Sequence, residues 1–223
     1  MSFSVAIDGP AASGKSTIAK ELANCLGLVH IDTGAMYRAI TYLCLKKGID
    51  CQDKDKVNAT LNQINIELTV DEKVFINGED VTDAIRTSAV SDNVSYIAAI
   101  KEVRLFLVIL QRDMTKNLSI VMDGRDIGTY VLPDAEIKIF MIASVEKRAT
   151  RRFLENQQMG REGTYEEILA NLKKRDYIDS HRDFAPLKPA EDSIILDTSD
   201  LTIPEVVEAC KKIISDKLGK EIV

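Results

Sequence analysis

The chain has 223 residues, of which 45% are hydrophobic and 29% are charged, an ordinary globular balance. Its formal net charge of −6 argues against a broad nucleic-acid-binding surface, which needs clustered positive charge. No apolar run reaches the length of a membrane span, and the first residues lead directly into a charged loop. We therefore expect a soluble, cytoplasmic protein without a signal peptide that binds neither membranes nor nucleic acids.

Residues 9–16 read Gly-x-x-x-x-Gly-Lys-Ser, the pattern of a phosphate-binding loop. An apolar run at 3–7 precedes it and predicts a buried strand, and a run with helical spacing follows it. Glycines let such a loop turn tightly, so that its N–H groups line an anion site at a helix N-terminus. The pattern predicts nucleoside triphosphate binding, with Lys15 on the terminal phosphates and the Ser16 hydroxyl on Mg²⁺. The residues of the predicted nucleotide site are Gly9, Pro10, Ala11, Ala12, Ser13, Gly14, Lys15, Ser16 and Thr17.

The rest of the chain alternates between strand and helix patterns. Further strands are predicted at 28–31, 119–123, 137–143 and 194–196. Helices are predicted at 35–47, with Thr33 as its cap, and at 57–64, 88–99, 101–116, 145–159, 165–177 and 203–218. This alternation, with a phosphate loop after the first strand, predicts an α/β fold: a three-layer, doubly wound parallel sheet that binds ligands at the carboxyl ends of its strands.

Residues 50–87 depart from this alternation. Apolar and polar side chains alternate at 66–70, ending at Val70, and again at 74–76. The charged residues 71–73 between the two runs predict a tight antiparallel hairpin. We therefore expect a small insertion on the parallel core.

The cysteines of the chain have neither Cys-x-x-Cys spacing nor nearby histidines. They are Cys25, Cys44, Cys51 and Cys210. Buried, reduced thiols are expected instead of a metal site or disulfides, which suits a cytoplasmic protein. His30 and His181 are the only histidines, so a histidine-based metal site or triad is not expected.

Charged residues suggest a site for a small anion. Arg175, Asp179 and Arg182 stand three or four residues apart, which places them on one face of a helix. A carboxylate between two guanidiniums can accept ribose hydroxyls while the arginines bind phosphate; a surface ladder of ion pairs is the alternative. Asp123 ends a predicted strand, the usual place for an acid that contacts Mg²⁺ through water. Asp8, beside the phosphate loop, is a second candidate for a substrate or metal contact.

Residues 148–175 read as a charged helical hairpin with Gly160 and Gly163 at its tip. Few large apolar residues, glycine hinges and clustered arginines predict a mobile lid over an anion. A rigid surface hairpin is the alternative.

Four motifs together resemble the bacterial-type cytidylate kinases, a nucleoside monophosphate kinase family with a phosphate-binding loop. The motifs are GPAASGKST from Gly9, DTGAMYR from Asp32, DGRDIGT from Asp123 with PDA after it, and RDxxDSxRxxxPL from Arg175. The resemblance implies transfer of the γ-phosphate of ATP to CMP or dCMP with Mg²⁺, a step of pyrimidine nucleotide metabolism. It also implies one kinase domain over 1–223, with a core at about 1–48, 101–147 and 183–223, a monophosphate-binding insertion at about 49–100 and a lid at about 148–182.

The resemblance also implies roles for single residues. Those implied to hold the acceptor phosphate are Thr33, Arg38, Arg125 and Arg182. Those implied to read the cytosine edge are Ser95, Arg104 and Asp126. Asp179 would hold the sugar, Arg175 would lie near the transferring phosphate, and Arg148 and Arg152 would contact ATP from the lid. The implied catalytic residues are Lys15, Arg125, Arg175 and Arg182. One departure is Lys101, which stands where the family often has proline.

Other functions stay open on the residues alone. A GTPase-type regulatory switch shares the phosphate loop, but the sequence lacks the Asn-Lys-x-Asp motif that reads guanine. A kinase for another small acceptor, such as UMP or shikimate, would use the same chemistry. A monomer is the default expectation, because no coiled-coil pattern or exposed apolar strand favours association.

Overall fold

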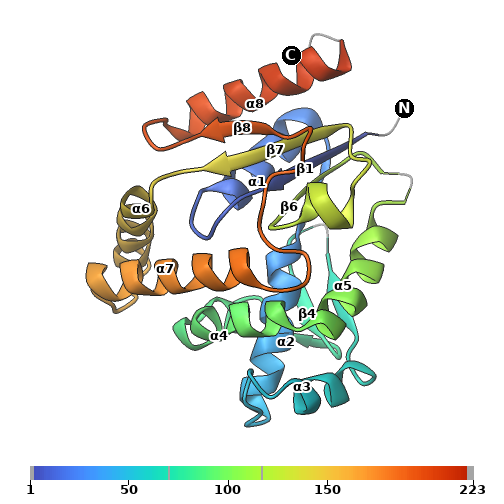
Figure 1. The fold of residues 1–223 in the computed structure, drawn as a ribbon, viewed down its shortest axis with the longest axis vertical. Helices are drawn as coiled ribbons and strands as arrows, with labels where there is room; N and C mark the ends of the chain where they lie inside the picture. Colours follow the sequence, from blue (N-terminus) through green and yellow to red (C-terminus); the bar gives the residue numbers. More distant parts are fainter. Residues whose placement is uncertain (1–2, 70, 117, 220–223) are drawn as a thin grey trace.

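The computed structural model describes residues 3–69, 71–116 and 118–219 (Figure 1). Five parallel strands form the main sheet in the order β2-β6-β1-β7-β8. Their bounds are β1 Ser4–Asp8, β2 Val29–Asp32, β6 Ile120–Gly124, β7 Ile137–Ile142 and β8 Ile194–Asp197. The predicted α/β fold with a doubly wound parallel sheet is confirmed, and each strand lies within one residue of its prediction.

Helices cover both faces of the sheet (Figure 1). Their bounds are α1 Lys15–Leu26, α2 Thr33–Lys46, α3 Lys54–Leu61, α4 Ser88–Ala99, α5 Lys101–Met114, α6 Val145–Gln158, α7 Tyr165–His181 and α8 Ile203–Leu218. Neighbouring side chains of β1 point to opposite faces: Val5 and Ile7 pack with α1 and α8, whereas Ala6 packs with Val108 of α5. These contacts produce the three predicted layers. No helix among the described residues is both long and apolar enough to cross a bilayer.

The insertion carries a second, antiparallel sheet in the order β3-β4-β5. Its strands are β3 Ile66–Leu68, β4 Val74–Ile76 and β5 Glu79–Asp80. The predicted hairpin is confirmed, although Val70 lies outside the described residues, and the short β5 was not predicted. Ile76 packs against α2 and α4 in a cluster that includes Met36, Ile40 and Ile97, so the insertion shares one apolar core with α2.

Two predicted helix starts were wrong because aspartates cap these helices. At the start of α2, the Asp32 carboxylate accepts the N–H of Ala35, so the cap is Asp32 and not Thr33. Thr33 is the first helical residue, and its hydroxyl donates to the backbone oxygen of Asp123 at 2.7 Å. Helix α3 begins at Lys54, three residues before its prediction, because Asp53 caps it in the same way.

Other local features also differ from the expectation. Helix α7 continues to His181, which brings Asp179 fully onto the helix. Ile100 separates α4 from α5 in an extended conformation (φ −77°, ψ 119°), so the helix break needs no proline at position 101. Three of the cysteines are buried free thiols, but Cys25 is exposed in the last turn of α1, whose buried face is formed by other residues.

Gly9 joins β1 to the phosphate loop where no side chain fits. A Cβ at Gly9 would clash with the backbone oxygen of Met141 on β7, an atom that a strand cannot easily move. We expect Gly9→Ala to lower the free energy of unfolding by about 3 kcal/mol. Gly27→Ala is the matched control, because φ is also positive there. An added Cβ would meet no non-neighbouring atom of the described residues within 4 Å, so strain alone should cost about 1 kcal/mol. Urea unfolding compares the two variants, and equal losses would contradict the clash.

Candidate active site

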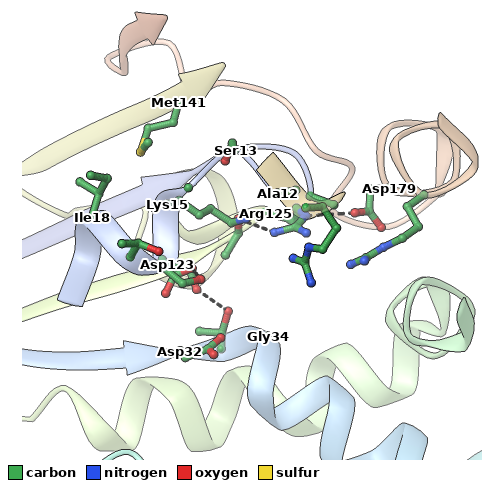
Figure 2. Close-up of a pocket in the computed structure, with 18 of the residues that line it drawn as sticks. Ala12, Ser13, Lys15, Ile18, Asp32, Gly34, Asp123, Arg125, Met141 and Asp179 are labelled. Atoms are coloured by element: carbon green, nitrogen blue, oxygen red, sulfur yellow. Dashed lines mark hydrogen bonds and ion pairs between the residues drawn. The ribbon is translucent and has the colours of Figure 1, made fainter. Parts of the chain in front are cut away.

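A cavity of about 670 Å³ lies at the carboxyl edge of the main sheet (Figure 2). The register pairs Asp32 of β2 with Asp123 of β6, and Asp8 of β1 with Gly124, so three strands end side by side there. The predicted site residues that line the cavity are Ala11, Ala12, Ser13, Gly14, Lys15, Ser16, Thr17, Thr33, Arg38, Ser95, Arg104, Asp123, Arg125, Asp126, Arg152, Arg175, Asp179 and Arg182. The structure therefore brings together side chains from all four motifs. Gly9, Pro10 and Arg148 lie outside the cavity lining.

The phosphate loop places Lys15 at the N-terminus of α1. Gly14 has a φ of 89°, a left-handed conformation that turns the chain into the helix. The Lys15 side chain is largely buried, and its Nζ donates to the backbone oxygen of Pro10 at 3.1 Å. Burial, with a smaller contribution from the charge of Arg125, lowers the pKa of Lys15 to about 7. An anion bound in the loop would raise the pKa of Lys15 again, because it favours the protonated amine.

Ser16 and Asp123 meet beside the loop. The Ser16 hydroxyl donates to Oδ2 of Asp123 at 2.7 Å, and Asp123 is buried. A hydroxyl and a carboxylate are hard oxygen donors, which suit Mg²⁺. No group of three or more acidic, histidine or cysteine side chains among the described residues could hold a metal alone. The donor set therefore fits a magnesium ion that takes its remaining ligands from phosphates and water, the usual arrangement for this ion.

Asp8 has a different role from the one expected. Its two carboxylate oxygens accept the N–H groups of Ile127 and Gly128, both at 2.8 Å. These groups begin a π-helical turn, Ile127–Val131, that was not predicted. Burial raises the pKa of Asp8 to about 7. Asp8 therefore anchors the segment after Arg125 instead of facing a substrate or metal.

A cluster of arginines surrounds Asp179 across the cavity from the loop. Nε of Arg125 donates to Oδ2 of Asp179 at 3.0 Å (Figure 2). Burial alone would raise the pKa of Asp179, but the charges of Arg125, Arg175 and Arg182 hold it below its ordinary value. Nε of Arg175 and both terminal nitrogens of Arg182 are buried without a hydrogen-bond partner among the described residues. Buried donors of this kind need acceptors, so the cluster fits an anionic ligand.

The far end of the cavity combines apolar side chains with buried charge. Arg104 is ion-paired with Asp126, and a terminal nitrogen of Arg182 lies 3.6 Å from the same carboxylate. The Arg104 guanidinium lies 5.3 Å from the centre of the Tyr37 ring. Val94, Ser95 and Ala98 of α4 line the cavity too. This end fits a planar ring with a polar edge.

Arg38 connects α2 to the insertion. Its guanidinium donates to the Ser91 hydroxyl at 2.9 Å and to the backbone oxygen of Ile85 at 3.3 Å. Burial and the charge of Arg175 lower the pKa of Arg38 to about 9. Like the arginine cluster around Asp179, Arg38 places a positive charge where solvent screens it little.

The two arginines expected to contact ATP from α6 differ in position. Arg148 donates to the backbone oxygens of Ala11 and Ala143, at 3.0 and 2.9 Å, and to Asp176 at 2.7 Å. It thus supports the phosphate loop from behind. Arg152 lines the cavity and pairs with Glu155 at 3.2 Å.

Sequence reasoning missed several cavity residues. Arg151 lines the cavity beside Arg152 and donates to the backbone oxygen of Thr198. Arg86 of the insertion also lines it and pairs with Asp32 at 2.9 Å. Neither arginine belongs to one of the four motifs, so only the folded chain reveals its position.

Comparisons with known proteins agree with the motifs. A family model described as cytidylate kinase matches residues 5–216. The chain belongs to the cytidylate kinase family. The cytidylate kinase of Bacillus licheniformis is 50% identical over 97% of both chains, and that of Caldicellulosiruptor saccharolyticus is 47% identical over 99% of both. A solved gluconokinase from Sinorhizobium meliloti has a TM-score of 0.52 at 12% identity, covering 96% of this chain and 92% of its own, which is a likeness of fold alone.

Proposed function

We propose that this chain transfers the γ-phosphate of ATP to CMP or dCMP, giving ADP and CDP or dCDP. The observation that carries the proposal is one cavity that joins the phosphate loop to an arginine cluster. Several buried N–H groups of this cluster lack a hydrogen-bond partner in the described part of the chain. Membership of the cytidylate kinase family supports cytidine nucleotides as acceptors.

The chemistry needs no catalytic base. A monophosphate has a second pKa of about 6, so near neutral pH its oxygen is already a nucleophile. The obstacle is repulsion between two polyanions: two unit charges about 4 Å apart repel by roughly 4 kcal/mol at an effective dielectric constant near 20. Lys15, Arg125 and Arg175 would offset this repulsion and stabilise the negative charge on the phosphoryl group during its transfer.

On the donor side, the phosphate loop would hold the ATP phosphates. The Ser16 hydroxyl would contact Mg²⁺ directly and Asp123 would contact it through water. When bound, Mg²⁺ neutralises charge on the β- and γ-phosphates. Lys15 and the loop N–H groups orient the γ-phosphate toward the acceptor.

On the acceptor side, Thr33, Arg38, Arg125 and Arg182 would bind the phosphate, and Asp179 would bind the sugar. Ser95, Arg104 and Asp126 would read the base. Cytosine offers an amino donor next to ring acceptors, which complements a carboxylate beside a guanidinium. The buried Arg104–Asp126 pair supports this assignment.

The insertion at about 49–100 would act as the acceptor-binding part of a single kinase domain, and residues 148–182 as its lid. Helix α7 runs alongside α4 (Figure 1). Asn171 donates to Asp92 at 2.7 Å, and Nζ of Lys174 lies 4.9 Å from the centre of the Tyr96 ring. Closure of this lid against the insertion would exclude water, which otherwise competes with the nucleotide as the phosphate acceptor. A monomer remains a prediction, and the mass of the protein in solution tests it.

Binding of ATP should be linked to protonation of Lys15. Near pH 8 the amine of the free protein is mostly neutral, because its pKa is about 7. The triphosphate raises that pKa, so binding should take up close to one proton near pH 8 and almost none near pH 6. Calorimetry in buffers of different ionisation enthalpy measures this uptake. Lys15→Ala is the control, and an uptake that persists in this variant would assign it to another group.

The reaction is tested by ADP formation from Mg-ATP with CMP, dCMP, UMP, AMP, GMP and shikimate as acceptors. We expect strong activity with CMP and dCMP alone. Activity with another acceptor would keep the phosphate chemistry and overturn the base assignment. ADP formation that is independent of any acceptor would instead favour a nucleotide-binding switch.

A further inference from the structure

His30 lies between Asp123 and the insertion hairpin. On β2, its Nε2 lies 2.9 Å from Oδ1 of Asp123, and its Nδ1 lies 3.1 Å from Oε1 of Glu72. The His30 side chain is only 9% exposed. One imidazole therefore bridges a carboxylate of the main sheet and a carboxylate of the insertion.

Both oxygens of Asp123 are thereby engaged. Oδ2 accepts the Ser16 hydroxyl and Oδ1 faces His30, so the plane of the carboxylate is fixed from two sides. Both neighbours of His30 are carboxylates, which accept hydrogen bonds, so each ring nitrogen must donate.

We propose that His30 is a positioning residue for the magnesium site, because it orients the Asp123 carboxylate and ties it to Glu72 of the insertion. The inference rests on the proposed function, since it concerns how the chain binds magnesium–ATP. His30 does not line the cavity, so it acts on the ligand only through Asp123.

The contact also joins the main sheet to the insertion. Glu72 also forms an ion pair with Lys20, whose side chain is half exposed. The pair Arg86–Asp32 makes a second polar contact between the insertion and the end of β2. Through His30, the position of the insertion is coupled to the geometry of the metal-binding carboxylate.

Two variants with amide side chains separate the two hydrogen bonds of His30. In His30→Gln the amide nitrogen lies near the former Nε2 and can still donate to Asp123. In His30→Asn it lies near the former Nδ1 and can donate only to Glu72. Glu72→Gln keeps an acceptor for Nδ1 but removes the charge, and Lys46→Gln breaks a distant exposed ion pair with Glu79 as a control.

The readouts are the free Mg²⁺ concentration that gives half the maximal rate, and the affinity for ADP measured calorimetrically with and without Mg²⁺. We expect His30→Asn to raise the half-saturating Mg²⁺ concentration about 10-fold and to remove most of the gain in ADP affinity that Mg²⁺ provides. KM for CMP and the ADP affinity without Mg²⁺ should stay unchanged. His30→Gln should resemble the wild type, Glu72→Gln should give a smaller rise, and Lys46→Gln should give none.

Equal effects of the Asn and Gln variants, or equal losses of ADP affinity with and without Mg²⁺, would reduce His30 to a purely structural role and overturn the proposal. If His30→Asn does not fold, an unchanged Mg²⁺ response in Glu72→Gln has the same consequence. Measurements of ADP binding and of CMP phosphorylation by the wild-type protein test this inference and the proposed function separately. A protein that binds ADP in a Mg²⁺-dependent way but does not phosphorylate CMP would refute only the latter.

Discussion

Replacing Lys15 with alanine should lower kcat about 10²- to 10³-fold while the fold stays intact. The Lys15 amine lies in the phosphate loop at the N-terminus of α1, with the charges of Arg125 and Arg175 nearby. There it would stabilise negative charge that develops during transfer, in a site that solvent screens little. Steady-state kinetics with Mg-ATP and CMP measure the loss.

The fold of Lys15→Ala should survive, because burial already penalises the charged amine in the free protein. Circular dichroism and thermal unfolding check this point. Lys56→Ala is a matched control, since its ion pair with Asp53 is exposed and contributes little. Near-normal turnover of Lys15→Ala would remove Lys15 from the mechanism.

Replacing Arg125 with alanine should lower kcat/KM for CMP about 10²- to 10³-fold and leave ADP affinity unchanged. Arg125 follows β6 and lies in the cavity opposite the loop, where it pairs with Asp179. Its removal deletes one guanidinium from the arginine cluster around Asp179, but Arg175 and Arg182 still compensate the buried carboxylate. The stability of the protein should therefore change little.

Arg125→Lys distinguishes charge from geometry. A lysine keeps the positive charge but cannot offer two parallel donors to a phosphate, so it should restore only part of the activity. Steady-state kinetics with CMP measure the effect on the acceptor side, and calorimetry with ADP measures the effect on the donor side. Parallel losses of CMP turnover and ADP affinity in Arg125→Ala would contradict its place on the acceptor side.

Much of the architecture could be read from local patterns. The phosphate loop has a specific sequence pattern with a strand before it and a helix after it. The strand was therefore predicted within one residue, and the helix was predicted in its place after the loop. Buried parallel strands are continuous apolar runs, which explains the accuracy at 137–143. Helix starts were less accurate where two candidate caps compete, because Asp32 and Thr33 are both good caps and only the fold selects one.

The placement of side chains in the cavity depended on information that the sequence does not carry. The rotation of α6 decides that Arg152 lines the cavity while Arg148 supports the loop, and both arginines fit the same helical spacing. The role of Asp8 depends on the π-helical turn that its carboxylate caps. The His30–Asp123 contact exists because β2 and β6 are neighbours, and strand order cannot be read from a single strand pattern.

The most direct test of the central claim is to separate and quantify the nucleotides formed by the wild-type protein from Mg-ATP and CMP. Anion-exchange chromatography resolves the four nucleotides. Phosphoryl transfer predicts that ADP and CDP appear in equal amounts, and that little ADP forms without CMP. Formation of ADP without CDP, at the same rate with and without CMP, would contradict the account.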